Sequence, residues 1–449
     1  MLIMTVAQII IIITLLAFVV VGLIVKKSKM ASYSDFTMNR GRLNWFTIAA
    51  GISMTFAGGA SILTTSSIGY TFKWYSLVDP ISLILGIIIV LIFYKRYEKD
   101  LGTTVSDLLS SNHKGLTILI GTVTSFTFIL IVAANFVSLS KLLSPYFPTV
   151  NPLLLTFIFS TLVFSYVFFG GFNSVTRTDI LQYVLITTLL IIPILIFVIN
   201  HHDNLTASVI THNFEIMPVD YIILLSIPMF FTPLSQDINI RIKSAKNSKH
   251  GRCGLIVGSI FYSSIVISTA YVGIYLGNNN IELSDPEQAV PFFFKNNFQQ
   301  FGFLAIIAAL AAIVSSLDSY ILNSMTSISN DIIKPVTKSK IRVSRTIRIA
   351  ALITYVVAMS IALFFNQILV LTLTSLLIYI SVLMPIIVGK KLELSGNGLF
   401  IGSLINVIII IIIEVLSLQI SPKALLYPLF GCVVMSIICL FKFGNNERY

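Results

Sequence analysis

The residues best suited to bind an ion lie in one apolar stretch, AAIVSSLDSYILNS, at positions 311–324. Ser315, Asp318 and Ser319 follow one another at i, i+3 and i+4, so their side chains share one face of a helix. Hydroxyl and carboxylate oxygens suit an alkali cation, and a charge in hydrocarbon is tolerated mainly where it faces a partner, an ion or water. The stretch therefore predicts a cation site. The alternative is structural, because small residues and serines also occur where helices pack closely.

Other carboxylates also fall inside apolar segments. Asp179 and Asp318 are expected to lie close together with a cation or a shared proton between them, because two unpaired carboxylates do not both stay charged in a low dielectric. The alternative for Asp179 is an ion pair with Arg177 or Arg241. Glu414 lies about one turn from the outer end of its segment and is expected to reach the interface.

Two further aspartates lie beside prolines or helix interruptions. Asp79 precedes Pro80, a pair that is typical of a helix start, so Asp79 either caps a helix or faces a cavity. If it faces a cavity, it favours a solute with an amine or several hydroxyls over a simple carboxylate. Gln236 and Asp237 follow a proline-interrupted run and are candidates for substrate contacts or for an inner gate.

Long apolar segments must hold these side chains. The chain of 449 residues is 56% hydrophobic and only 10% charged, whereas a soluble protein carries roughly a quarter charged residues. Apolar runs of about 20 residues cross a bilayer as helices. We therefore predict an all-α polytopic membrane protein with thirteen transmembrane helices. Their approximate ranges are 4–25, 44–70, 74–94, 117–140, 152–169, 178–200, 220–240, 254–277, 300–330, 349–366, 368–389, 397–418 and 424–441.

The basic residues predict the orientation of these helices. With the N-terminus outside and the C-terminus inside, all but four of the 29 Lys and Arg residues lie on the cytoplasmic side, as the positive-inside rule requires. The four exceptions are Lys73, Lys141, Lys295 and Lys423. This distribution accounts for the net charge of +11 without nucleic acid as a partner. Basic residues follow the first segment and no small-residue cleavage site does, which indicates a retained helix.

Several classes of chemistry are not expected from the sequence. The three cysteines form no C-x-x-C pair and the five histidines fall in loops or at segment edges, which argues against disulfides, a metal cluster and a histidine proton relay. Walker A and H-E-x-x-H patterns are absent from the sequence, so ATP-driven transport and zinc-protease activity are not expected. We predict that the protein is not an enzyme and uses no cofactor.

Two of the predicted helices are interrupted at matching places. The segment 44–70 contains a glycine pair at 58–59, and the segment 220–240 contains prolines at 228 and 233. Glycine permits non-helical backbone and proline removes a hydrogen bond. These segments open two sets of five helices, and an odd number per set inverts the second set in the membrane. An inverted repeat with broken first helices indicates a midplane binding site in a secondary transporter; packing kinks are the alternative.

The order and spacing of several stretches resemble the sodium:solute symporter family, which includes proline, pantothenate, sialic acid and sodium/glucose carriers. The resemblance extends over nearly the whole chain, starting at FTMNRGRLNWFTIAAGIS, residues 36–53. The stretches that carry it are the broken helix ending in Gly-Tyr at 69–70, FGGFNSVTRTDILQ at 169–182, SQDINIRIKSAK at 235–246 and AAIVSSLDS at 311–319.

The resemblance implies a leucine-transporter-like fold of thirteen helices with a 5+5 inverted repeat. It also implies a sodium site between the segments 44–70 and 300–330. The implied ligands are the backbone carbonyls of Met54, Ala57 and Ala312 and the hydroxyls of Ser315 and Ser316. Some members of the family hold a second sodium, and the matching positions here are Asp179, Ser315, Asp318 and Ser319.

The substrate is expected at the midplane, between the two helix breaks. The candidate cavity residues are Phe56, Gly58, Ser61, Asp79, Asn135, Gln236 and Asp237. Two of them depart from the family: Phe56 stands where some carriers have Asp or Asn, and Gly58 stands where Ser is common. The polar contacts of those carriers therefore do not all transfer. Asp318 stands where several members have Ser or Thr, which adds negative charge to a second cation site.

These observations favour a sodium-coupled secondary symporter that imports a small organic solute, of the amino acid, sugar or carboxylate type, by alternating access. The alternatives are a proton-coupled carrier on the same fold, with Asp318 or Asp179 taking the proton, and a non-transporting sensor or receptor. The expected partners are the solute, Na⁺ and the lipid of the plasma membrane, with the protein functional as a monomer. The expected regions are 1–43 with an extra helix and loop, a core at 44–390 with repeats at about 44–200 and 220–389, and two C-terminal helices at 391–449.

Overall fold

The computed structural model shows an all-helical chain. It describes residues 5–24, 41–99, 102, 104–110, 113–170, 172–200, 219–298, 301–337, 343–417 and 426–440. Within these ranges, β-structure is limited to one isolated bridge between Leu43 and Ala245. The prediction of an all-α protein is confirmed for the part of the chain that the structure describes.

Helices occupy every predicted segment of the N-terminal half. They are α1 (Val6–Ile24), α3 (Trp45–Phe56), α4 (Gly59–Phe72), α5 (Val78–Ile92), α8 (Lys114–Leu143), α9 (Pro152–Gly170), α10 (Phe172–Ile186) and α11 (Ile192–Asn200). A π-helical turn at Thr187–Ile191 joins α10 to α11. The short helices α6 (Tyr94–Lys99) and α7 (Val105–Leu109) lie between α5 and α8.

The C-terminal half follows the same plan. Its helices are α13 (Val219–Leu225), α14 (Pro228–Leu234), α15 (Gln236–Ser244), α16 (Ser248–Asn278), α17 (Ala289–Asn297), α18 (Gly302–Ser327), α19 (Lys334–Thr337), α20 (Val343–Phe364), α21 (Ile368–Lys391), α22 (Gly396–Ser417) and α23 (Leu426–Leu440). Within the described residues, seven helical segments are long and apolar enough to cross a membrane.

The first predicted interruption separates α3 from α4. Helix α3 ends at Phe56, Ala57 leaves helical geometry, and Gly58 is extended, with φ −76° and ψ −179°. A Cβ on Gly58 would collide with the hydroxyl of Ser316. Glycine is therefore needed here for close approach to α18 rather than for an unusual φ.

The second interruption has two steps. Pro228 is the first residue of α14, where its missing N–H costs nothing, and Ser226 and Ile227 separate α14 from α13. Ser235, with φ −65° and ψ 128°, then separates α14 from α15. Pro233 lies inside α14, so the second step comes two residues later than this proline.

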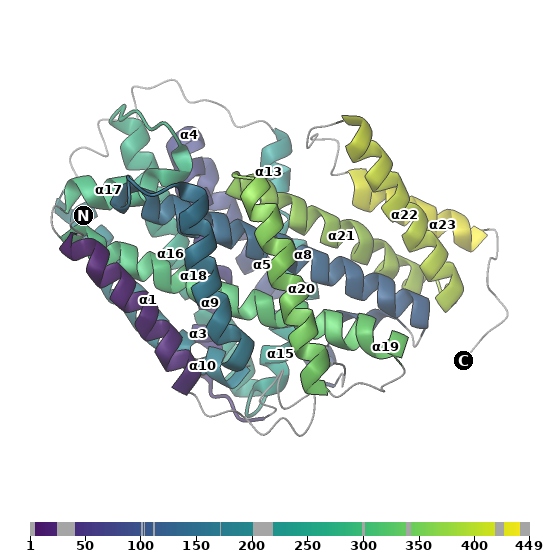
Figure 1. The fold of residues 1–449 in the computed structure, drawn as a ribbon. Helices are drawn as coiled ribbons and strands as arrows, with labels where there is room; N and C mark the ends of the chain where they lie inside the picture. Colours follow the sequence, from purple (N-terminus) through teal and green to yellow (C-terminus); the bar gives the residue numbers. More distant parts are fainter. Residues whose placement is uncertain are drawn as a thin grey trace.

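Helix α18 lies at the centre of the bundle and packs against α8, α10, α3 and α20 (Figure 1). Its residues from Ala305 to Ser327 are all buried, as expected for a helix that is apolar or small-sided all round. Helix α16 packs along α3 and α4, and α14 packs against α5. Helices α22 and α23 lie together on one side of the molecule, far from α1 on the other (Figure 1).

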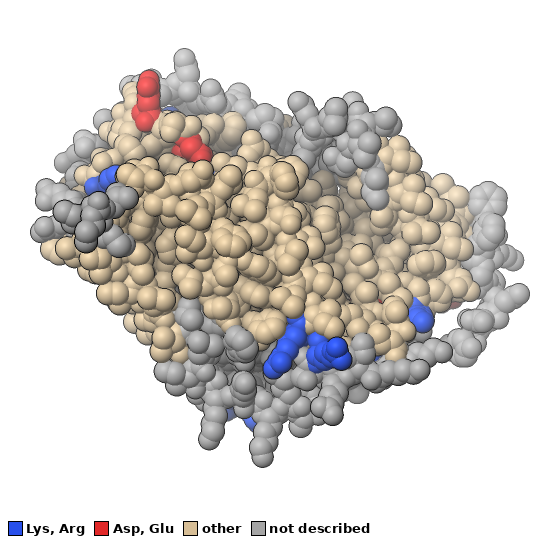
Figure 2. Space-filling view, in the orientation of Figure 1, with Lys and Arg blue, Asp and Glu red and all other residues tan. Residues whose placement is uncertain are grey.

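The outer surface is apolar over a broad band. Large hydrophobic side chains are exposed along α1, α5, α9, α20, α22 and α23, far more than a soluble monomer shows. Figure 2 shows most visible Lys and Arg side chains toward the lower edge and Asp and Glu toward the upper edge, with uncharged residues between. The protein is a multi-pass membrane protein whose apolar band faces lipid.

Candidate functional site

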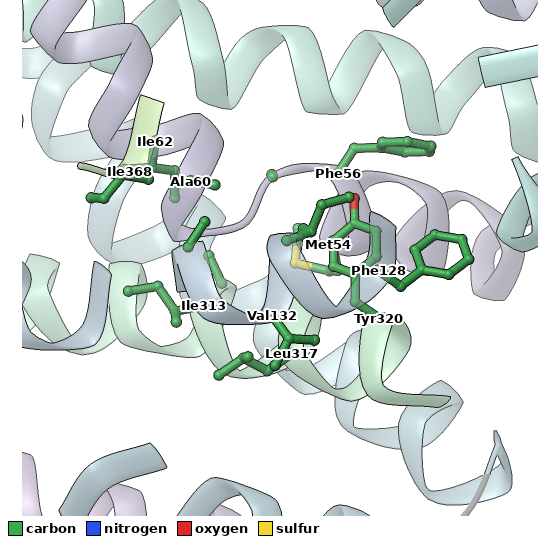
Figure 3. Packing of buried hydrophobic residues seen from close by; sticks show 14 of the residues in the cluster. Met54, Phe56, Ala60, Ile62, Phe128, Val132, Ile313, Leu317, Tyr320 and Ile368 are labelled. Atoms are coloured by element: carbon green, nitrogen blue, oxygen red, sulfur yellow. The ribbon is translucent and has the colours of Figure 1, made fainter. Parts of the chain in front are cut away.

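The break between α3 and α4 lies against the serines of α18. The Ser316 hydroxyl donates to the carbonyl oxygens of Met54 at 2.9 Å and Thr55 at 2.8 Å. These carbonyls belong to the last turn of α3, where backbone acceptors lose their helical partners. Figure 3 shows the non-helical passage between Phe56 and Ala60 beside Met54.

Among the predicted ligands of the first sodium site, Met54 and Ser316 are therefore brought into contact. Ala57 and Ala312 are completely buried, with Ala57 in the break itself. Ser315, one residue earlier on α18, donates instead to a carboxylate oxygen of Asp179 on α10 at 2.5 Å.

Asp179 belongs to a buried ionic cluster that includes an arginine. The Arg241 guanidinium lies 3.6 Å from Asp179 Oδ2 and donates from Nε to Asp237 Oδ2 at 2.8 Å. Its Nη2 also donates to Thr55 Oγ1 at 2.8 Å. Both Arg241 and Asp179 have no exposed surface, so the guanidinium compensates carboxylate charge inside the protein.

This arrangement bears on the predicted second cation site. The sequence left Asp179 either beside a cation or paired with Arg177 or Arg241, and the structure places Arg241 there. The side chain of Arg177 lies outside the described residues, as does that of Glu414. Asp318 is completely buried on α18. Ser319 accepts a 2.9 Å hydrogen bond from Thr55, which ties this face of α18 to α3.

A cavity of about 60 Å³ lies next to the break. Five of the predicted substrate residues line it, namely Phe56, Gly58, Ser61, Asp79 and Asn135. Its other walls include side chains of α14, α16, α18 and α21, among them Phe231, Thr232, Tyr262, Tyr320 and Thr372. The cavity therefore lies between the two broken helices.

Asp79 faces this cavity and does not cap a helix. Its Oδ2 accepts a 2.6 Å hydrogen bond from the hydroxyl of Tyr262 on α16. Helix α5 has Leu77 at its N-cap, without a side-chain capping bond. The capping alternative for Asp79 is therefore wrong, because the tertiary contact with Tyr262 takes the carboxylate away from the helix end.

Asn135 of α8 holds the start of α4. Its Oδ1 accepts the amide N–H of Gly59 at 3.0 Å, and its Nδ2 donates to the carbonyl of Ile131 at 2.9 Å. A Cβ on Gly58 would also approach Asn135 Oδ1 to 2.9 Å. One neutral side chain thus satisfies a backbone donor that a helix N-terminus otherwise offers to an anion.

Gln236 and Asp237 are not among the residues that line the cavity. The Gln236 side chain donates to Asn323 O at 3.3 Å and accepts from Ser327 at 2.9 Å, both on α18. Asp237 pairs with Arg241 four residues later. These contacts fasten the start of α15 inside the protein.

Sequence reasoning did not single out Thr55, Tyr262 and Phe231 for the site. Tyr262 lies in a segment of serines and aliphatic residues, where nothing in the pattern distinguishes it. The pairing of Arg241 with Asp237 could have been predicted, because Arg241 follows Asp237 by one helical turn, the spacing of an ion pair on a helix. The described residues contain no group of three or more His, Cys, Asp or Glu side chains that could hold a metal ion.

Comparisons with known proteins find relatives and solved structures that this chain resembles. The sodium/sialic acid symporter NanT of Aliivibrio fischeri (strain ATCC 700601 / ES114) is 25% identical over 373 residues, which cover 76% of this chain and 73% of NanT. A solved substrate-bound, outward-open Na⁺-coupled sialic acid symporter superposes with a TM-score of 0.72 at 17% identity, covering 97% of both chains.

A second solved structure has the same fold at lower similarity. Mhp1, a nucleobase-cation-symport-1 family transporter in a closed conformation with bromovinylhydantoin bound, gives a TM-score of 0.57 at 13% identity. The match covers 90% of this chain and 95% of Mhp1. These similar proteins are transporters and not enzymes.

The sodium:solute symporter family is matched over residues 36–389, most of the chain and all of the core helices. The match confirms the resemblance found in the sequence. On this evidence, the chain belongs to the sodium:solute symporter family, whose members move a solute across a membrane together with Na⁺.

Proposed function

We propose that this protein imports a small organic solute with sodium by alternating access. The observation that carries the proposal is the contact of Ser316 with the carbonyls of Met54 and Thr55, directly beside an enclosed cavity. Free carbonyls at a helix break and serine hydroxyls are the oxygen ligands that a sodium ion takes in a discontinuous-helix transporter.

The first sodium site comprises the carbonyls of Met54, Ala57 and Ala312 and the hydroxyls of Ser315 and Ser316. When sodium binds, the Ser316 hydroxyl turns its hydrogen away from the carbonyls and presents its oxygen to the ion. The same ion draws the end of α3 toward α18. Gly58 lies close to Ser316 and also lines the cavity. The movement of α3 therefore sets the position of this part of the cavity wall, which couples ion binding to solute binding.

A second cation site is proposed at Asp179, Ser315, Asp318 and Ser319. Arg241 neutralises Asp179 in the structure, so a second sodium has to compete with this guanidinium or displace it. We expect two sodium ions per solute in the unaltered protein and one in the Asp318→Asn variant, measured as flux ratios in proteoliposomes. A ratio of one in both proteins would remove the second site. A ratio of two in both would remove Asp318 from it.

The arrangement in the membrane is also a proposal. Thirteen transmembrane helices with the N-terminus outside and the C-terminus inside would place the basic edge of Figure 2 in the cytoplasm. The regions are an N-terminal extra helix (1–43), a core of inverted repeats (44–200 and 220–389, within 44–390) and two C-terminal helices (391–449). The protein would work as a monomer in the plasma membrane, without a cofactor beyond Na⁺.

The two alternative functions, a proton-coupled carrier and a sensor, differ from sodium symport in what the protein binds and moves. A proton-coupled carrier would use Asp179 or Asp318 as the proton acceptor, and a sensor would bind solute without accumulating it. We favour sodium because the carbonyl oxygen of Met54 and the hydroxyl of Ser316 do not change protonation state near neutral pH, so they suit a metal cation and not a transported proton.

The proposal predicts sodium-specific stabilisation of the purified protein. We expect NaCl to raise the thermal unfolding midpoint above that in equal KCl, because binding to the folded state alone stabilises it by mass action. A solute screen in both salts, followed by uptake into vesicles under a sodium or a proton gradient, would then identify the driving ion. Equal midpoints in both salts, with uptake driven by a proton gradient alone, would contradict sodium coupling.

A further inference from the structure

We propose that the cavity selects an organic cation, a compact solute whose charged group is an ammonium, and not an anionic sugar acid. The inference rests on the proposed symport function and names the substrate class of the same site. It departs from the sialic acid symporters, to which the chain is 25% and 17% identical over the aligned residues.

The charge of the cavity is the first argument. Among the described residues that line it, Asp79 is the sole acidic residue, and Lys, Arg and His are absent. Asp79 is a partly buried residue of the cavity wall, and its Oδ2 accepts the hydrogen bond of Tyr262. A bound ammonium favours the ionised form of this carboxylate and is favoured by it. A bound carboxylate would meet a like charge without a basic partner from the wall.

The walls supply the second argument. Four aromatic rings line the cavity, from Phe56, Phe231, Tyr262 and Tyr320. Phe56 and Tyr262 meet edge to face at 6.3 Å between ring centroids, and Tyr262 also holds Asp79. Aromatic rings together with a single carboxylate are the kind of wall residues with which proteins recognise alkylated ammonium groups.

The helix start at the cavity gives the third argument. The N-terminus of α4 would be the natural place for an anion, because free amide N–H groups and the helix dipole attract negative charge. Here Asn135 Oδ1 already accepts the N–H of Gly59 at 3.0 Å, and the Ser61 hydroxyl donates to Phe56 O at 2.6 Å. Two donors that a sugar acid would need are therefore used inside the protein.

The test uses matched ligands that differ only in charge. Thermal stabilisation of the full-length protein in NaCl is measured with ethanolamine beside propan-1-ol and with choline beside 3,3-dimethylbutan-1-ol, so that each ammonium ion is compared with its uncharged isostere. Betaine, which adds a carboxylate to the quaternary ammonium, and N-acetylneuraminate complete the series. We expect at least one ammonium ion to bind about tenfold or more tightly than its uncharged counterpart, and N-acetylneuraminate not to compete.

Variants assign the effect to Asp79. Asp79→Asn keeps the size of the side chain and should abolish the preference for the charged ligand, whereas Glu282→Gln, the same change at an exposed outer position, should leave it intact. The comparison of choline with its isostere uses the unaltered protein, so it decides the question even if Asp79→Asn does not fold.

Several results would overturn the inference. The inference fails if no ammonium ion stabilises the protein, or if ammonium ions and their uncharged counterparts bind equally. It also fails if betaine or N-acetylneuraminate binds more tightly than any ammonium ion. Finally, it fails if Asp79→Asn keeps the preference for the charged ligand. Sodium stabilisation without solute is read separately. If sodium stabilises the protein but no ammonium ion does, the substrate class is wrong and sodium coupling stands. If sodium does not stabilise the protein but ammonium ions bind in a way that depends on Asp79, sodium coupling is wrong and the substrate class stands.

Discussion

Replacing Arg241 with Met should lower the free energy of unfolding by about 3–5 kcal/mol, the usual cost of removing one partner from a buried ion pair. The guanidinium has no exposed surface and is the basic group that contacts both Asp179 and Asp237. Without it, the two carboxylates share a water-poor interior with no compensating charge, and Thr55 loses a donor.

A second variant reaches the same cluster without changing a charge. Gly51 of α3 lies under the guanidinium, where an added Cβ would overlap Nη1 of Arg241. Gly51→Ala should therefore displace the arginine and destabilise the protein, although alanine favours helix by about 1 kcal/mol over glycine in an exposed position.

Unfolding in mixed detergent micelles measures both variants. Arg252→Met is the matched control, because Arg252 is an exposed residue over the ring of Tyr94 and losing an exposed cation–π contact should cost no more than about 1 kcal/mol. Adding Asp179→Asn and Asp237→Asn to Arg241→Met should restore part of the stability. A stable Arg241→Met variant, or no restoration, would mean that the cluster does not depend on charge balance.

The central cluster shows where sequence reasoning reached its limit. The positive-inside count places Arg241 with the cytoplasmic basic residues, and the sequence left open whether Asp179 pairs with Arg177, with Arg241 or with a cation. The structure buries Arg241, because α15 follows a break at Ser235 and so enters the bundle. Membrane orientation follows from summed charges, whereas the depth of one side chain depends on the path of the backbone.

Asp79 illustrates a second limit. Asp followed by Pro is equally compatible with a helix cap and with a cavity wall, because local chemistry is the same in both. The deciding partner, Tyr262, is 183 residues away in the sequence, and no local pattern reports such a contact. By contrast, the breaks at Gly58 and Pro228 could be predicted, because glycine and proline act on their own backbone.

Ser315 and Ser316 of α18 could also be predicted as site residues from the sequence. Their replacement is the second change for which we expect a large effect. In the double variant Ser315→Ala and Ser316→Ala, sodium affinity should fall by at least about tenfold, since loss of even an outer-shell contact commonly weakens metal binding 10–100-fold. The reason is geometric: Ser316 is the side chain seen against the carbonyls of Met54 and Thr55.

The two single variants should differ in their effects on folding. Ser316→Ala removes one hydroxyl donor, which is shared between the carbonyls of Met54 and Thr55, at a cost of about 0.5–1.5 kcal/mol. Ser315→Ala takes a donor from the buried carboxylate of Asp179, which leaves the neutralisation of that charge to Arg241. We expect Ser316→Ala to be the better-folded variant and still to lose sodium-dependent stabilisation.

Ser324→Ala separates ion binding from general damage to α18. Ser324 is equally buried on the same helix, and its hydroxyl forms a 2.9 Å hydrogen bond with Thr354 on α20. It should lose a similar amount of stability and keep the sodium dependence of both thermal stabilisation and uptake. If Ser324→Ala and Ser316→Ala lowered sodium affinity equally, the effect would come from helix packing. If neither did, the sodium ligands would have to be sought elsewhere than at the α3 break, because the Ser316 hydroxyl bridges that break to α18.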